Sequence, residues 1–334
     1  MACRMRIGVI GVGRMGRVHA TSLAEVGGVD VLITDVDVDR AAEVGRELGV
    51  DVAAGLEELI GGSDAIVVAA ATDAHADLIH AAADAALPTF CEKPISLDLE
   101  STAAVVAHVE KSGIPFMMGF QRRFDPGYLA AHNLVRDGSI GTVYVVRMAG
   151  HDPAPPHEAY IATSGGIFRD FSVHDFDAVR FVTGQEVVSV YADGGVVEFP
   201  VFTKYGDVDT AVAVLRLSGG SLGILSATRH DPLGYDIRME LIGSRDCVAV
   251  GWDDRTPLRS VEPGGGPAPS SPYRDFQDRF REAYRAEMAH FVELAAGREK
   301  SPCTAQDALE ALRIAVACDR SRAERRPVSL EEIG

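Results

Sequence analysis

The 334-residue chain is poor in basic charge and has no long apolar run. Lysine and arginine number 32 against 49 aspartates and glutamates, which gives a net charge of −17. Nucleic acids and anionic membranes bind basic surfaces, so we expect neither as a partner. No stretch approaches the roughly 18 consecutive apolar residues of a membrane span. The first residues also lack the apolar core of a signal peptide.

Cysteine is scarce as well, and its positions are scattered. The five cysteines are Cys3, Cys91, Cys247, Cys303 and Cys318. An odd number without a CxxC pair indicates neither a disulfide framework nor a thiolate metal site. With no leader segment visible, we expect a protein of the reducing cytoplasm.

The first part of the chain alternates strand and helix patterns. Strands are expected at 6–12, 29–35, 64–72, 88–94 and 115–120, and helices at 14–26, 39–49, 75–87 and 99–113. Alternation at this spacing predicts an α/β domain with a parallel, doubly wound sheet, as in a Rossmann fold. We place this dinucleotide-binding domain at residues 1–121.

The pattern changes after residue 121. Strands are expected at 142–150, 186–194, 210–230 and 235–244, with a hairpin turn at 218–220, and helices at 125–141, 165–184, 276–297 and 304–324. We expect residues 122–334 to form an α+β domain on a large, mostly antiparallel open sheet. A sheet with one uncovered face is a candidate oligomer surface.

The motif GVGRMG places Gly11, Gly13 and Gly16 between the first strand and the first helix. In this context the glycines permit a tight turn, the approach of a pyrophosphate and close helix packing. The alternative is a glycine-rich turn without a ligand. Asp35 ends the second strand, where a carboxylate accepts the ribose hydroxyls of NAD and repels the 2′-phosphate of NADP. We therefore expect NAD, with Arg40 as a surface residue.

Two further segments carry candidate chemistry. CEKP (91–94) follows a strand at the edge where ligands bind, so Lys93 is placed to hydrogen-bond a substrate oxygen. The alternative is a solvated Lys–Glu pair.

In residues 165–177, Asp170, His174 and Asp177 lie at helical spacing. A neutral imidazole suits a general base near neutral pH, and Asp170 would fix its tautomer. A structural Asp–His bond or a metal site are the alternatives to this reading.

Together, GVGRMG, ITD, ATDAH, EKP, GFQRRFDPGY and DFSVHDFD resemble the Gfo/Idh/MocA oxidoreductases over nearly the whole chain. Within that family, GFQRRFDPGY, the Asp–His helix and GYDI (234–237) are most similar to bacterial inositol 2-dehydrogenases. The resemblance implies a homotetramer formed through the open sheet. It also implies NAD-dependent oxidation of a cyclitol, with myo-inositol to 2-keto-myo-inositol (scyllo-inosose) as the leading reaction. Alternatives are a dehydrogenase of another inositol isomer, an aminocyclitol or a hexose, a redox-neutral NAD-dependent glycoside hydrolase, and a non-catalytic NAD-binding regulator.

The resemblance also implies roles for individual residues. The catalytic set is Lys93, Asp170 and His174, with His174 as base and Lys93 as polariser of the substrate oxygen, or the reverse. The expected cofactor-binding residues are Gly11, Gly13, Arg14, Met15, Gly16, Asp35, Thr72, His75, Glu92, Gln121 and Arg122. The expected substrate residues are His151, Asp152, Asp177 and Tyr235. No metal is expected.

One departure from the family pattern leaves the substrate open. The inositol enzymes typically read His-Arg-Asn-Pro where this chain reads His-Asp-Pro at 151–153. Asp152 thus exchanges a cation for an anion near the substrate, which suits an amino-substituted cyclitol or a different hydroxyl stereochemistry.

Overall fold

The computed structural model describes residues 4–334, so Cys3 lies outside the described residues. The chain divides into two compact units. Unit 1 comprises the chain up to Phe124 together with Glu282–Leu309, and unit 2 comprises Asp125–Arg281 together with Glu310–Gly334. No helix among residues 4–334 has the length and apolar character needed to cross a membrane.

Residues 282–309 belong to unit 1, whereas the sequence predicted that all of residues 122–334 form the second domain. Aromatic packing explains this placement. The ring of Tyr284 lies 6.0 Å from that of His19, and the ring of Phe291 lies 5.8 Å from that of Phe90. The helix that carries both aromatics therefore buries its apolar side against the first sheet and its first helix.

Unit 1 contains a six-stranded, wholly parallel sheet in the order β3-β2-β1-β4-β5-β6. Its strands are β1 (Met5–Ile10), β2 (Val29–Thr34), β3 (Asp51–Val52), β4 (Ala65–Val68), β5 (Thr89–Glu92) and β6 (Phe116–Gly119). Its helices are α1 (Arg14–Ala24), α2 (Val38–Leu48), α3 (Leu56–Gly61), α4 (Thr72–Asp84), α5 (Leu99–Ser112), a 3₁₀ turn (Gln121–Phe124) and α10 (Arg281–Ala295). This order confirms the predicted doubly wound sheet.

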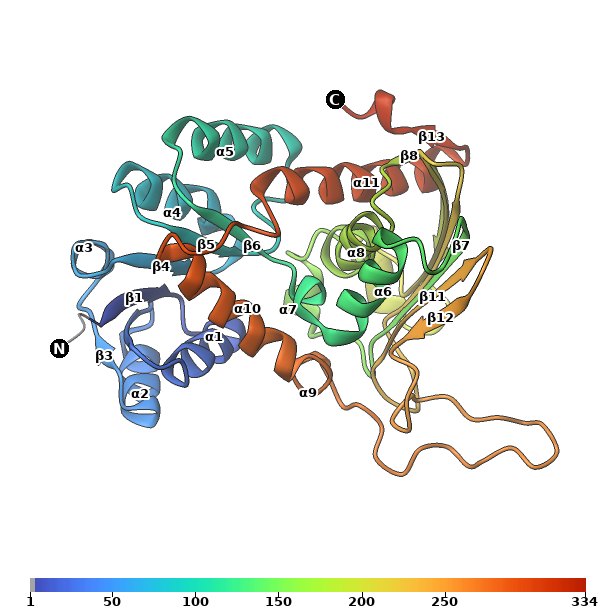
Figure 1. Cartoon of the computed structure of the whole chain (residues 1–334), viewed down its shortest axis with the longest axis horizontal. Coiled ribbons are helices and arrows are strands. Elements are labelled where there is room, and N and C mark those ends of the chain that lie inside the picture. Colours follow the sequence, from blue (N-terminus) through green and yellow to red (C-terminus); the bar gives the residue numbers. More distant parts are fainter. Residues whose placement is uncertain (1–3) are drawn as a thin grey trace. The chain divides into compact units, whose positions relative to one another are not determined.

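The central strands of this sheet are buried along their whole length, as in β4 and β5. Parallel strands covered on both faces need such continuous apolar runs. Helices α1 and α2 lie on one face and α4 and α5 on the other (Figure 1). The short elements β3 and α3 were not predicted from the sequence, because neither spans enough residues to show a periodic pattern.

Unit 2 contains a seven-stranded sheet in the order β12-β11-β7-β10-β9-β8-β13. Its strands are β7 (Val143–His151), β8 (Val187–Gly195), β9 (Thr210–Leu217), β10 (Leu222–Thr228), β11 (Asp236–Gly243), β12 (Cys247–Val250) and β13 (Val328–Ser329). Only β7 and β10 pair in parallel, so the sheet is mostly antiparallel as predicted. The predicted hairpin turn joins β9 to β10.

The helical elements of unit 2 differ in detail from the prediction. They are α6 (Pro126–Arg136), α7 (Glu158–Ile161), a π-helical turn (Ile167–Ser172), α8 (Val173–Thr183), α9 (Phe276–Arg279) and two 3₁₀ turns (Pro200–Tyr205 and Leu330–Glu332). Helix α11 (Ala305–Glu324) begins in unit 1 and continues in unit 2. The expected helix at 165–184 is thus a π-helical turn followed by α8, and the expected helix at 276–297 is interrupted at Phe280.

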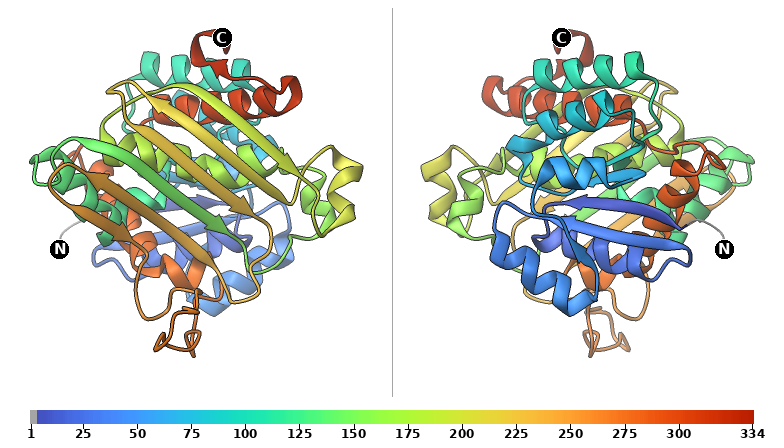
Figure 2. Two further views of the ribbon diagram at one scale, coloured as in Figure 1. Left: turned by 90° about the vertical axis from the view of Figure 1, so that its right-hand side faces the viewer. Right: turned by 90° about the vertical axis from the view of Figure 1, so that its left-hand side faces the viewer.

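One face of the unit 2 sheet carries no helix (the left view of Figure 2). Along β9, exposed and buried residues alternate, as expected for a strand covered on one side. The exposed side carries a group of apolar side chains beside charged ones such as Arg216. Val214 lies opposite Ile224 of β10 and Tyr191 of β8, and all three side chains are exposed by 43–47%.

Candidate active site

The GVGRMG turn connects β1 to α1 in unit 1. Gly11 has a φ of +84°, and a Cβ there would lie 2.6 Å from the Cα of Ala70. A Cβ on Gly16 would lie 1.8 Å from the carbonyl oxygen of Gly11, so helix and turn pack too closely for any side chain. Gly13, by contrast, faces open space, and no side chain caps the first turn of α1. The backbone N–H groups of this turn therefore fit a dinucleotide pyrophosphate.

Arg14 and Met15 occupy the first turn of α1, and Asp35 directly follows β2. The Asp35 carboxylate is largely buried and accepts hydrogen bonds from the backbone N–H of Val12 at 2.8 Å and of Asp37 at 2.9 Å. Arg40 of α2 is exposed, as predicted, but no pattern in the sequence indicated its contact: its Nη1 lies 3.2 and 3.3 Å from the two Asp35 oxygens. The ribose end of the turn thus presents a carboxylate already paired with a guanidinium.

The remaining cofactor candidates follow other strands at the same edge of the sheet. Thr72 begins α4 after β4, and Gln121 and Arg122 form a buried 3₁₀ turn after β6. His75 is buried, with Nδ1 2.8 Å from the carbonyl oxygen of Pro94 and Nε2 3.0 Å from that of Ala70. The imidazole therefore links the β4 turn to the EKP turn.

Glu92 and Lys93 lie at the carboxyl end of β5. Glu92 is buried, and its Oε1 lies 2.6 Å from His19 Nε2 of α1. Its Oε2 accepts the backbone N–H of Lys93 at 3.2 Å. The carboxylate of Glu92 thus points into unit 1 and fixes the backbone at Lys93, whose own side chain is only half-buried.

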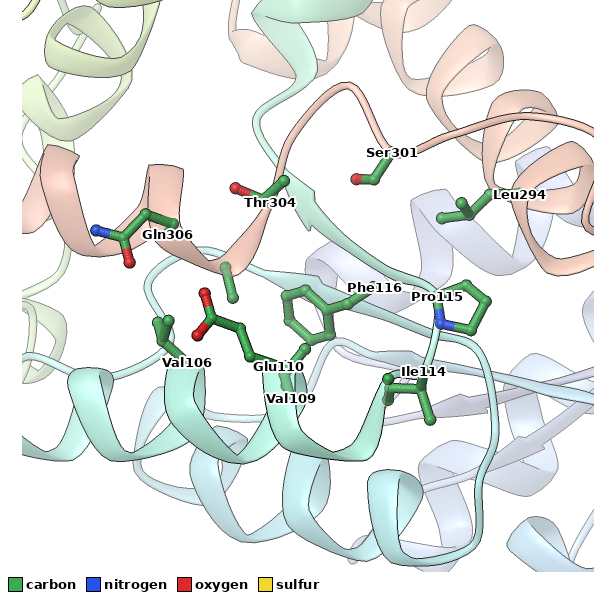
Figure 3. A pocket seen from close by; sticks show the side chains of 12 residues that line it. Val106, Val109, Glu110, Ile114, Pro115, Phe116, Leu294, Ser301, Thr304 and Gln306 are labelled. Carbon is green, nitrogen blue, oxygen red and sulfur yellow. The ribbon is translucent and has the colours of Figure 1, made fainter.

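A separate hollow of about 380 Å³ lies at the amino end of β6 (Figure 3). Its lining is mostly apolar and includes Val109, Ile114, Phe116 and Leu294. The GVGRMG turn and Lys93 follow the carboxyl ends of their strands, at the opposite edge of the sheet. The hollow is therefore no part of the candidate cofactor site.

In unit 2, the predicted stripe of Asp170, His174 and Asp177 is divided between two kinds of helix. Asp170 lies in the π-helical turn, whereas His174 and Asp177 lie in α8. The wider turn changes the angle between Asp170 and the α8 residues, so the simple α-helical spacing does not hold across it. Asp177 is completely buried and Asp170 nearly so.

Two glycines and one side-chain contact determine where the π-helical turn begins. Gly165 and Gly166 adopt φ values of +84° and +91°, and Asp207 accepts the backbone N–H of Ile167 at 3.0 Å. These contacts direct the chain into the turn. The Asp170 carboxylate is then bound on both oxygens, by the Tyr160 hydroxyl at 2.7 Å and by Arg229 Nη2 at 3.0 Å.

Sequence reasoning missed Arg229. It follows β10 directly, is 3% exposed, and also donates from Nη1 to Asp152 at 3.3 Å. Its two carboxylate partners are 59 and 77 residues away along the chain, so no local motif signals the contact. The inositol enzymes typically have an arginine directly after the histidine that corresponds to His151, where this chain has Asp152. In this chain Arg229, from the end of β10, places a guanidinium beside that position.

His151, at the end of β7, lies between two carboxylates. Its Nδ1 is 3.6 Å from Asp231 and 3.5 Å from Asp236, and its Nε2 is 3.1 Å from the Ser226 hydroxyl. Burial acts to lower the pKa of His151, but the two aspartates outweigh it and raise the pKa to about 9. The imidazole is therefore positively charged near neutral pH.

His151, Asp231 and Asp236 also have the donor types and proximity of a divalent metal site, with ligand atoms within 4.8 Å of one another. Arg238 binds Asp236 at 2.7 and 2.9 Å. A metal would have to displace the His151 proton and lie beside this second cation. The arrangement therefore favours a network of ion pairs. Tyr235, just before Asp236, is buried, and its backbone N–H bonds to Tyr273.

Comparisons with known proteins show the family to which the two parts of the chain belong. Residues 5–120 match the model of an oxidoreductase family with an NAD-binding Rossmann fold, and residues 128–248 match the Gfo/Idh/MocA C-terminal domain. The chain is 40% identical to myo-inositol dehydrogenase Hyg17 of Streptomyces leeuwenhoekii, covering 95% of this chain and 97% of that protein. It is 38% identical to the myo-inositol 2-dehydrogenase of Thermotoga maritima, covering 98% and 99%.

Among solved structures, the scyllo-inositol dehydrogenase of Lactobacillus casei with bound NAD(H) and scyllo-inositol superimposes with a TM-score of 0.88. The two sequences are 28% identical, and the match covers 98% of this chain and 99% of that one. These matches confirm the resemblance seen in the motifs. The chain belongs to the Gfo/Idh/MocA family of oxidoreductases and carries that family's NAD-binding Rossmann fold in its first part.

Proposed function

We propose that the protein is an NAD-dependent dehydrogenase that oxidises a secondary alcohol of a cyclitol, with myo-inositol to 2-keto-myo-inositol as the leading reaction. The observation that carries this proposal is similarity over the whole chain, in both the nucleotide-binding and the C-terminal part, to proteins named inositol dehydrogenases. The intact GVGRMG turn and the paired Asp35 support NAD as the cofactor.

In this proposal the turn after β1 holds the pyrophosphate and Asp35 holds the adenosine ribose. The bound nicotinamide supplies the acceptor for the hydride that leaves the alcohol carbon. The hydroxyl proton passes to His174, and Asp170 stabilises the imidazolium that forms. Lys93 donates a hydrogen bond to the same substrate oxygen. The exchange of roles between Lys93 and His174 is the alternative assignment.

The second candidate, an aminocyclitol dehydrogenase, rested on the negative charge of Asp152. The Arg229 guanidinium lies 3.3 Å from that carboxylate and, although it also pairs with Asp170, offsets part of its charge. An ammonium group on the substrate would then gain little from Asp152. This contact weakens the argument from Asp152 for an amino-substituted substrate.

Absorbance of NADH at 340 nm tests the proposal, with NAD or NADP and a panel of inositol isomers, aminocyclitols and hexoses. Strong NAD-dependent turnover of myo-inositol is the expected result. Tight NAD binding with no NADH formed on any substrate would contradict it. Cleavage of a glycosidic bond without net NADH would then assign the protein to the redox-neutral hydrolases.

We also propose a homotetramer that assembles through the uncovered face of the unit 2 sheet. The exposed Tyr191, Val214 and Ile224 on adjacent strands support this, because contiguous apolar patches on soluble proteins mark interaction surfaces. A location in the cytoplasm stays a prediction from the scattered cysteines.

A further inference from the structure

Arg229 is a deeply buried cation beside two carboxylates assigned to the candidate site. Its side chain is 3% exposed, and its backbone N–H donates to the Asp209 carbonyl at 2.8 Å. This backbone bond fixes the position of the residue at the end of β10. The guanidinium then lies 5.2 Å from the centre of the Phe171 ring, directly after Asp170 in the chain.

The two terminal nitrogens of Arg229 bind different partners. Nη2 donates to Asp170 Oδ2 at 3.0 Å, and Nη1 donates to Asp152 Oδ2 at 3.3 Å. One side chain thus connects the π-helical turn to the segment after β7. A lysine could not reproduce this contact, because its ammonium is a single point charge without the planar fork of donors.

The electrostatics of the cluster agree with this geometry. Burial acts to lower the pKa of Arg229, but Asp170 and Asp152 outweigh it and raise the pKa above its ordinary value. Asp207, before β9, adds to the effect. By reciprocity the guanidinium favours the ionised forms of the carboxylates. Tyr160 of α7 donates to the other oxygen of Asp170 and favours the same ionised state.

We propose that Arg229 is a positioning residue that holds Asp170 and Asp152 as a joined pair of carboxylates. This inference rests on the proposed function. It makes Asp170 a fixed anion that orients and stabilises the His174 imidazolium, and it excludes Asp170 as the acceptor of the substrate proton. It also draws Asp152 into an ion pair with the cation that binds Asp170, so that the negative charge of Asp152 is no longer unpaired.

Arg229→Met and Arg229→Lys test the inference, each assayed for kcat, KM and the pH profile of kcat/KM. We expect kcat to fall roughly 10- to 100-fold, as for other residues that orient a reacting side chain. The acidic limb of the profile should move to higher pH in Arg229→Met, since the carboxylates lose their cation. Adding Asp152→Asn to Arg229→Met should restore part of the lost kcat, because it removes one unpaired charge.

Arg279→Met is the matched control, since Arg279 pairs with Asp125 at 2.8 Å and both side chains are nearly as buried. We expect this variant to lose thermal stability. Its kcat and KM should stay within about twofold of wild type, and the acidic limb of its profile should stay at the wild-type pH, as expected for a change away from the site. The inference is wrong if Arg229→Met changes kinetics no more than Arg279→Met does.

Thermal unfolding of the cofactor-free protein separates this inference from the proposed function. The midpoint of Arg229→Met should fall further below wild type at pH 8 than at pH 4.5. Without their cation the two buried carboxylates have raised pKa values in the variant, so they bind protons at the lower pH and the penalty for burying their charges is relieved there. If wild type forms no NADH but this pH dependence holds, the proposed function fails and the pairing stands. A midpoint difference independent of pH overturns the pairing itself.

Discussion

Glu92 Oε1 and His19 Nε2 lie 2.6 Å apart inside unit 1, and a second acid, Glu287 of α10, is completely buried in the same unit. Neither side-chain oxygen of Glu287 has a hydrogen-bond partner among the described residues. Burial, with the nearby charge of Glu92, raises the pKa of Glu287 well above its ordinary value. Burial therefore favours the protonated form of Glu287, whereas Glu92 is hydrogen-bonded to His19 and to the backbone of Lys93.

Two isosteric substitutions should then have opposite effects on the free energy of unfolding. Glu287→Gln should match or exceed wild-type stability at pH 7, because an acid with a raised pKa destabilises the fold as pH rises above the unfolded value. Glu92→Gln should lose about 1–3 kcal/mol, as expected when a buried charged hydrogen bond is weakened. Urea unfolding at pH 5 and pH 7 measures both. A Glu287→Gln variant clearly less stable than wild type at pH 7 would mean that Glu287 is ionised.

Asp35→Ser should weaken the preference for NAD over NADP. The substitution removes the carboxylate expected to bind the ribose hydroxyls and leaves Arg40 available to a 2′-phosphate. We expect the Kd for NAD to rise about tenfold, which corresponds to the loss of one charged hydrogen bond. Fluorescence titration with both cofactors measures the ratio.

Asp37→Asn is the control, because Asp37 also binds Arg40 and the amide can still cap α2. This variant should keep the NAD preference. An unchanged ratio of affinities in Asp35→Ser would show that the ribose is bound elsewhere.

Lys93→Ala should abolish turnover, with a loss of roughly 10²–10⁴ in kcat, while the Kd for NAD changes little. The half-buried side chain follows β5, and the backbone there is already held by Glu92. Lys111→Ala, at the end of α5, serves as the control for loss of a lysine from the same unit. Unfolding, or a large loss of NAD affinity, would assign Lys93 a structural role.

The charged His151 predicts a specific dependence of stability on pH. Its pKa in the fold is about 9, above the ordinary value of 6.5. A raised histidine pKa contributes stability that is complete below pH 6.5 and is lost as pH rises through 9. The loss should be at most about 3 kcal/mol. His151→Gln should flatten the decline between these pH values in urea unfolding, whereas the exposed His157→Gln should leave it intact. Equal slopes in wild type and His151→Gln would contradict the ion-pair network.

Val214→Asp should dissociate the proposed tetramer, because it places a carboxylate between the exposed apolar side chains of Tyr191 and Ile224. Light scattering after gel filtration gives the mass. Val261→Asp is the control, since Val261 lies in a loop and is 84% exposed. A monomeric wild type, or an unchanged mass for Val214→Asp, would exclude this face as the interface.

Features encoded by neighbouring residues were predictable from the sequence. The glycines of GVGRMG, the alternating strands and helices, and the hairpin at 218–220 all depend on contacts within a short stretch of chain. Asp35 was found in the same way, because it belongs to a fingerprint of fixed spacing. The family resemblance added a prediction for the whole chain, because it depends on several short motifs spread along the sequence.

The features that were missed depend on contacts between distant segments. Arg40 is exposed as predicted, but its pairing with Asp35 was missed because it depends on how α2 folds back onto the turn. Arg229 reads in the sequence as one arginine at a strand end, and only the β7–β10 pairing brings it to Asp152. The π-helical turn at Asp170 depends on glycines and on Asp207, 40 residues beyond Ile167. Periodicity alone therefore could not predict it.

The division of the chain also has a consequence for how the protein is made. Unit 1 includes residues 282–309, so its aromatic contacts between Phe90 and Phe291 and between His19 and Tyr284 join the first third of the chain to its last fifth. During synthesis, the nucleotide-binding part cannot be finished when its strands emerge from the ribosome. It must wait for all of the sheet of unit 2 except β13 to be translated, so a messenger that ends before residue 282 would leave both units incomplete.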